Sequence, residues 1–201
     1  MGGDSPLLND PIDQVSVGFL GAGVSLLVAT VFYFAVNKYP QGGAELQRLQ
    51  GLIQTGARAF MIAEFKSLAV FVAVIGAALG VILIQEDNKE FGVWTMICFI
   101  AGAVLSATAG WIGMMVATSA NARTTTACEK DLASGLKVAF ASGAVMSFTV
   151  IGLGLAGLSI LYMFFRDEED VFNYLSGFGF GASSIALFAR VAGGVFTKAA
   201  D

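Results

Sequence analysis

Five apolar runs, each long enough to cross a bilayer, constrain this chain more than any other feature of its sequence. A transmembrane helix needs about 20 consecutive apolar residues. Only 13% of the residues are charged and 56% are hydrophobic, whereas a soluble domain has roughly a quarter of its residues charged. The sequence predicts one all-α, polytopic membrane domain, 1–201, with about five transmembrane helices. The runs cover residues 15–36, 67–84, 91–118, 136–165 and 171–196.

The composition also excludes several classes of function. The chain contains no histidine, which removes imidazole metal ligands and Ser-His or Cys-His catalysis. Its net charge of −4 argues against nucleic acid as a partner. Cys98 and Cys128 match no ligand spacing, and we expect free thiols, Cys98 in an apolar run and Cys128 in a charged loop.

The number of basic residues alternates between low and high in successive segments that flank the runs. This alternation predicts the orientation of the chain in the membrane. Segments rich in Lys and Arg stay on the cytosolic side. The pattern puts the N-terminus outside and the end of the chain in the cytosol. The basic residues after the first to fourth runs are Lys38, Arg48, Arg58 and Lys66; then Lys89; then Arg123, Lys130 and Lys137; then Arg166.

Residues 44–65 read as an amphipathic helix that precedes the second run and continues into it. Leu46, Leu49 and Ile53 share one helical face. Packing of this face against the cytosolic ends of other spans is the first interpretation, and a helix lying on the membrane surface is the alternative. The third and fourth runs exceed the bilayer thickness, so they either tilt or project into the cytosol.

Glycines at helical spacing predict close contact between helices. Gly76 and Gly80 form a GxxxG pattern in the second run, and small residues let helix backbones approach where lipid gives no hydrophobic drive. There are 25 glycines, more than five helices surrounded by lipid would need. We therefore expect further helices to pack against this bundle.

The fifth run carries charges that its neighbours lack. At about 100° per residue, Ser183, Arg190, Gly194 and Asp201 fall on one stripe, with Lys198 at its edge. Two interpretations stay open. Arg190 is either a snorkelling membrane anchor or a charge that pairs with an acid elsewhere. Lys198 and Asp201 are either a solvated helix end, or an anion contact and a hard-cation ligand.

Four segments of the chain resemble the membrane-bound, ion-pumping inorganic pyrophosphatases. The most specific is the last one, which resembles the segment that introduces the catalytic site in that family, and the resemblance covers most of the chain beyond residue 44. The segments are GARAF (56–60) together with EFK (64–66), GMMVATSANARTT (113–125), GAVMS (143–147) and ALFARVAGGVFTKAAD (186–201).

The resemblance implies a bundle of about sixteen helices, usually dimeric, that hydrolyses magnesium-pyrophosphate and moves H⁺ or Na⁺ out of the cytosol. It implies that Arg190 belongs to a gate below the active site, that Lys198 contacts phosphate, and that Asp201 is a catalytic carboxylate that binds Mg²⁺. A requirement for K⁺ stays open. The resemblance also implies a membrane of the vacuolar or acidic-store type, or a prokaryotic plasma membrane.

One carboxylate cannot hold several magnesium ions, because each needs many oxygen ligands. We therefore expect this chain to be the N-terminal portion of such a pump, inactive without the remaining helices. A passive channel or carrier subunit and a structural membrane scaffold are the alternatives. The choice between H⁺ and Na⁺ is not readable from these residues.

Overall fold

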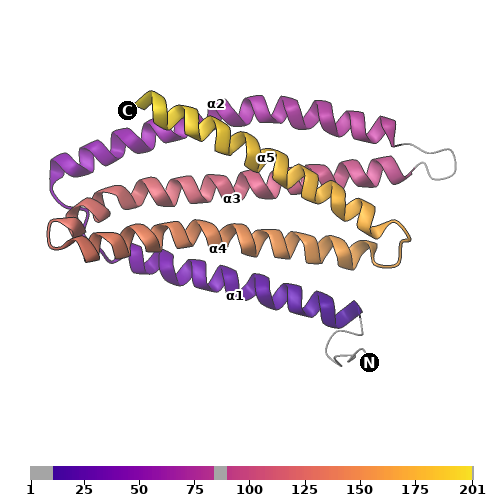
Figure 1. Cartoon of the computed structure of the whole chain (residues 1–201), viewed down its shortest axis with the longest axis horizontal. Coiled ribbons are helices and arrows are strands. Elements are labelled where there is room, and N and C mark those ends of the chain that lie inside the picture. Colours follow the sequence, from indigo (N-terminus) through magenta and orange to yellow (C-terminus); the bar gives the residue numbers. More distant parts are fainter. Residues whose placement is uncertain (1–10, 84–89, 201) are drawn as a thin grey trace.

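The described part of the chain forms five long α-helices (Figure 1). The structure is a computed structural model that describes residues 11–83 and 90–200; no strand occurs in that part. All five helices are long and apolar enough to cross a membrane, which confirms the predicted all-α, polytopic fold. Their bounds are α1 Pro11–Asn37, α2 Ala44–Ile82, α3 Glu90–Cys128, α4 Leu132–Phe165 and α5 Val171–Ala200.

Local sequence signals set several helix ends. Pro11 opens α1, a position where the missing N–H of proline costs no hydrogen bond. Pro40 follows the end of α1 and cannot continue a helix. Asp131 caps α4, because its carboxylate accepts from the Ser134 backbone N–H at 2.7 Å and from the Ser134 hydroxyl at 2.7 Å. The cap places the start of α4 four residues before the predicted 136.

Neighbours in the sequence are not always neighbours in the bundle. Figure 1 shows the order α2, α3, α4, α1 across the molecule, with α5 crossing over α3 toward α2. α1 packs along α4 and α2 packs along α3, whereas α1 and α2 do not contact each other. Phe32 of α1 stacks on Phe148 of α4 with ring centroids 6.3 Å apart.

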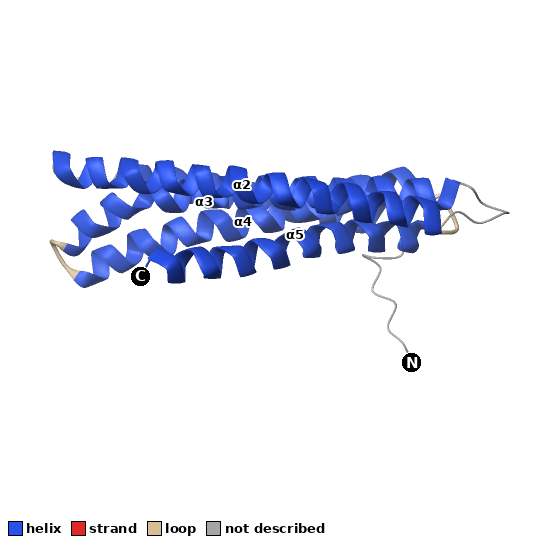
Figure 2. Cartoon of the chain, turned by 90° about the horizontal axis from the view of Figure 1, so that it is seen from above, coloured by secondary structure: helices blue, strands red, loops and turns tan. Residues whose placement is uncertain are grey.

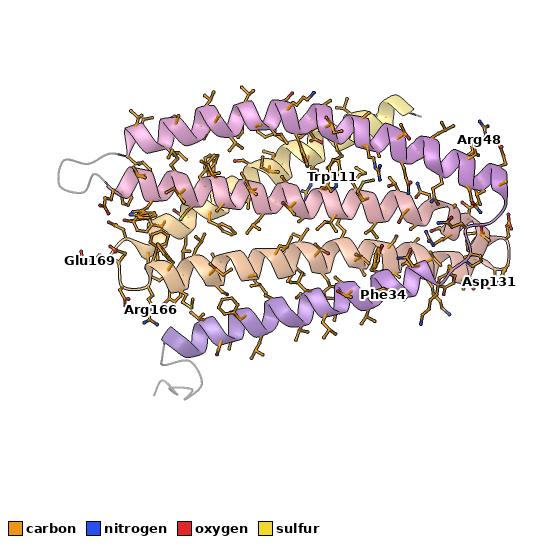
Figure 3. All side chains as sticks on the ribbon, turned by 180° about the vertical axis from the view of Figure 1, so that it is seen from behind. Phe34, Arg48, Trp111, Asp131, Arg166 and Glu169 are labelled. Atoms are coloured by element: carbon orange, nitrogen blue, oxygen red, sulfur yellow. The ribbon has the colours of Figure 1, made fainter. Side chains whose placement is uncertain are left out.

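Figure 2 shows the elongated bundle from above, with helix connections at both of its ends. Figure 3 places Arg48 and Asp131 at one end, where the α1–α2 and α3–α4 connections lie, and Arg166 and Glu169 at the other. The last residues of α5 point toward the end that holds Arg48 (Figure 1). The α1–α2 and α3–α4 connections, both predicted to be cytosolic, therefore share one end.

α2 and α3 are much longer than a bilayer is thick. Each has 39 residues and is about 58 Å long at 1.5 Å per residue, against a hydrocarbon thickness of about 30 Å. The prediction that Arg123 and Cys128 lie in a loop is wrong, because α3 continues to Cys128. Alanines at positions 120, 122 and 127 are buried at 1–5% exposure, so small side chains let this end of α3 pack closely.

α2 is one unbroken helix, and its contacts correct the predicted role of its apolar face. The residues that pack inward along the first part of α2 are Gln50, Ala57 and Met61. Leu49 and Ile53 are 44% and 48% exposed, so the stripe expected to pack against other spans faces outward here. α2 packs on α3 through a different face, which includes a polar contact between Gln50 and the Ala122 backbone N–H.

The largest core cluster joins α3, α4 and α5 near the end that holds Glu169. Tyr174 of α5 lies with its ring centroid 4.9 Å from that of Phe165 and 5.6 Å from that of Phe91. Cys98 is completely buried in this cluster. Both cysteines are free thiols, as expected, and Cys128 is exposed at the end of α3. Gly76 and Gly80 pack against Met96 of α3, which agrees with the predicted close contact.

Candidate functional site

The first half of α5 is held against α3 by contacts between backbones. A Cβ at Gly181 would collide with the carbonyl oxygen of Phe99, and a Cβ at Gly102 would collide with the carbonyl oxygen of Phe178. The Ser106 hydroxyl donates to the Ala182 carbonyl across the same interface at 3.0 Å. Because glycine alone permits this approach, the interface fixes the position of the helix that carries the candidate site.

The second half of α5 presents the predicted cations on an exposed surface. Arg190 and Lys198 are both exposed and lie on one continuous helix, about 12 Å apart along its axis. Ser183 and Gly194, expected on the stripe of Arg190, are exposed as well. Asp201, the predicted carboxylate and magnesium ligand, lies outside the described residues.

The described residues do not by themselves fit a magnesium site. Within 11–83 and 90–200, no group of three or more acidic, histidine or cysteine side chains is arranged to hold a metal ion. Mg²⁺ prefers carboxylates, water and phosphate oxygens in octahedral geometry. This part of the chain therefore offers positive charge to an anion, and the structure supports no step through a metal.

A buried polar cluster around Arg123 was missed by the sequence analysis. The guanidinium Nη1 of Arg123 donates to the Ser119 carbonyl at 2.7 Å, and the side chain is 91% buried, at 9% exposure. With the Gln41 amide oriented to satisfy both groups, its oxygen accepts from Arg123 Nη2 at 3.1 Å. Gln50 accepts from the Ala122 backbone N–H at 3.2 Å.

These contacts dock the α1–α2 connection onto the end of α3. Gly42 has φ of 77°, a conformation that glycine adopts without strain, and a Cβ there would collide with Thr126. A signal for this arrangement was present in the sequence. The Asp131 cap marks the start of α4, so α3 could extend as far as residue 128 and carry Arg123 on a helix rather than in a loop.

Comparisons of the sequence with known proteins identify a family and several relatives. A family profile described as "Inorganic H+ pyrophosphatase" matches residues 23–201. The K(+)-insensitive pyrophosphate-energized proton pump of Methanosarcina mazei is 41% identical over 178 residues, which cover 89% of this chain and 25% of that protein. The putative K(+)-stimulated pyrophosphate-energized sodium pump of Clostridium tetani is 40% identical over 182 residues, or 90% of this chain and 25% of that protein.

The chain thus spans about a quarter of the length of these relatives. Its similarity to a proton pump and to a sodium pump is nearly equal, so the ion is not distinguished by this segment. The matching profile covers all five helices except the first half of α1. The chain belongs to the inorganic H⁺ pyrophosphatase family.

Proposed function

We propose that this chain is part of a membrane pump that hydrolyses pyrophosphate and uses the released energy to move H⁺ or Na⁺ out of the cytosol. The observation that carries the proposal is the form of α5. Its first half is fixed against α3, and its second half presents Arg190 and Lys198 to an exposed surface. In the proposed orientation this surface belongs to the cytosolic side.

Lys198 is proposed to contact a phosphate group of the substrate. Pyrophosphate is polyanionic, and an ammonium group binds phosphate oxygens through short, charge-assisted hydrogen bonds. Lys198 lies in the last turn of α5, so its amine can reach beyond the helix end. Asp201 is proposed as the adjoining carboxylate, and Mg²⁺ is proposed to accompany the substrate and supply charge neutralisation there.

Arg190 is proposed to belong to the ion gate. It lies about two helical turns from Lys198 along α5. Within the described residues, no acidic side chain forms an ion pair with it. A cation near a membrane needs an acidic partner or water, and we propose that a helix from the remainder of the pump provides the acid. The same remainder, and a second copy of the pump, would complete the assembly.

The test compares variants of a longer pump polypeptide that contains this chain. K198A should lower kcat/KM for magnesium-pyrophosphate by about 100-fold or more, because about 3 kcal/mol is lost with a charged hydrogen-bonding partner. K137A removes an exposed lysine of α4 and serves as the control. Unchanged pyrophosphate hydrolysis by K198A would contradict the proposed contact.

R190A separates the gate from the hydrolytic site. We expect it to reduce ion transport per pyrophosphate hydrolysed, measured in proteoliposomes by a pH-sensitive dye and by ²²Na⁺ uptake.

Purified 1–201 alone should hydrolyse no pyrophosphate. Hydrolysis by that segment would disprove the proposal that the remaining helices complete the site.

A further inference from the structure

A cavity of about 390 Å³ lies between α2 and α5, and one acidic side chain enters it. Its lining residues come from α2 and α5, and Figure 1 shows α5 crossing toward α2. Its walls are almost entirely apolar, which is typical of sites for small organic ligands. The lining residues are Phe60, Ala63, Glu64, Ser67 and Leu68 of α2, with Phe188, Val191 and Ala192 of α5.

Glu64 lines this cavity, and its carboxylate is incompletely satisfied. Its Oε1 atom is buried and has no hydrogen-bond partner. The Ser67 hydroxyl, which also lines the cavity, donates to the Ala63 carbonyl of its own helix at 3.4 Å. A buried carboxylate oxygen without a donor is costly. The carboxylate of Glu64, beside the cavity, therefore has a polar requirement that the described residues do not meet.

No cation of this chain neutralises Glu64 in the described structure. Lys66 is two residues away and exposed, so it lies on another side of α2. Arg190 is on the same stretch of α5 but does not line the cavity. The ion pairs found within the described residues join Arg48 to Glu45 and Arg166 to Asp167. The described residues therefore supply no charge complement to Glu64.

We propose that the α2–α5 cavity binds an organic ammonium group, with Glu64 as its counter-ion. The aromatic side chains Phe60 and Phe188 line the cavity beside the acid. Aromatic rings combined with a carboxylate are the groups that bind alkylammonium ions, because the ring faces and the carboxylate both attract positive charge while the apolar walls hold the alkyl body. The site differs from the exposed Arg190 and Lys198 surface, which attracts anions.

The experiment uses two ligands of nearly equal shape. Benzyltrimethylammonium carries the charge, and neopentylbenzene is its neutral counterpart. Each is titrated into the 201-residue chain in lipid nanodiscs by calorimetry, with empty nanodiscs subtracted to remove partition into lipid. The cation should bind saturably, and E64Q should weaken that binding by at least about tenfold, the effect of removing a counter-ion from a cavity. Binding of neopentylbenzene should not respond to E64Q.

Two further variants protect the test against misfolding. E64D keeps the charge and should bind the cation within a few-fold of the unmodified chain. S67A removes a hydroxyl from the same cavity that is already bonded within α2, and it should bind normally. Equal cation affinity in E64Q and the unmodified chain, or no cation binding to the unmodified chain, overturns the proposal.

The natural ammonium group has two possible sources, a free amine or a lysine side chain of the rest of the pump. Titration of a longer pump polypeptide distinguishes them. If the longer polypeptide still binds the benzyltrimethylammonium cation, the natural ligand is a free amine. If the longer polypeptide does not bind the cation but regains binding when one lysine is neutralised, that lysine is the natural ammonium group. If binding is lost and no lysine variant restores it, the proposal is overturned. No arm contains pyrophosphate, so the result is independent of the proposed pump activity.

Discussion

The two halves of α5 show how one helix can be fixed and exposed at the same time. In the first half, Tyr174, Phe178 and Ile185 are buried and glycines bring α5 against the α3 backbone. In the second half, Leu187, Val191 and Val195 are 59–66% exposed. The difference teaches that the residues that position this helix are separate from those that carry its charges. Substitutions in the first half should act on stability, and those in the second half on chemistry.

Removal of the Tyr174 ring tests the buried half most strongly. Y174A should destabilise the chain by about 3–5 kcal/mol, because a large aromatic side chain leaves a cavity between Phe91 and Phe165. L187A in the exposed half should change stability by less than about 0.5 kcal/mol. Unfolding in mixed micelles by titration with dodecyl sulfate measures both. Equal losses would remove the distinction between the halves.

Alanine at a buried glycine tests the backbone contact itself. G181A should cost about 1–3 kcal/mol or separate α5 from α3, because the new Cβ meets the Phe99 carbonyl. Gly193 has nothing within 4 Å of an added Cβ, so G193A should be neutral or slightly stabilising through its helix propensity. The same unfolding titration checks both variants, and a tolerated G181A would contradict the close packing.

The hydrogen bond between α3 and α5 should contribute less. S106A removes the donor to the Ala182 carbonyl and should cost about 0.6 kcal/mol, a typical value for such bonds in membranes. The Ser183 hydroxyl donates to Phe180 of its own helix at 3.1 Å, so S183A should have almost no effect. A larger loss for S183A than for S106A would mean that the exposed face of α5 is also under structural constraint.

The smallest effect comes from a residue outside both halves and depends on pH. Hydrogen bonds from Ser134 lower the pKa of the Asp131 carboxyl from its usual 3.8. A lowered pKa means that this stabilisation is complete above the unfolded-state pKa and is lost as the pH falls through the folded-state pKa. Thermal midpoints between pH 6 and 3 should therefore fall less for D131N than for the unmodified chain, and parallel curves would contradict the cap.

The helical fold could be predicted because apolar length alone identifies membrane spans, and α5 kept its predicted start at Val171. The ends of helices that extend beyond the membrane were harder to predict from the sequence. The region around Arg123 contains charges that resemble a loop, and its burial depends on Gln41 and Gln50, far away in the sequence. Glu64 gave no periodic signal, because its importance arises only where α5 crosses α2. Local sequence patterns predict the length of a span, but they do not predict which helices pack against each other across the bundle.

The pairing of α1 with α4 has a consequence for biosynthesis. Residues 38–131 separate the end of α1 from the start of α4. At about 5–20 residues per second, the ribosome needs roughly 5–20 s to make them. For that interval the first helix waits in lipid without its partner, and it tolerates the wait because residues 15–36 contain no charged side chain. Any insertion factor that shields newly made spans would have its longest engagement with this helix.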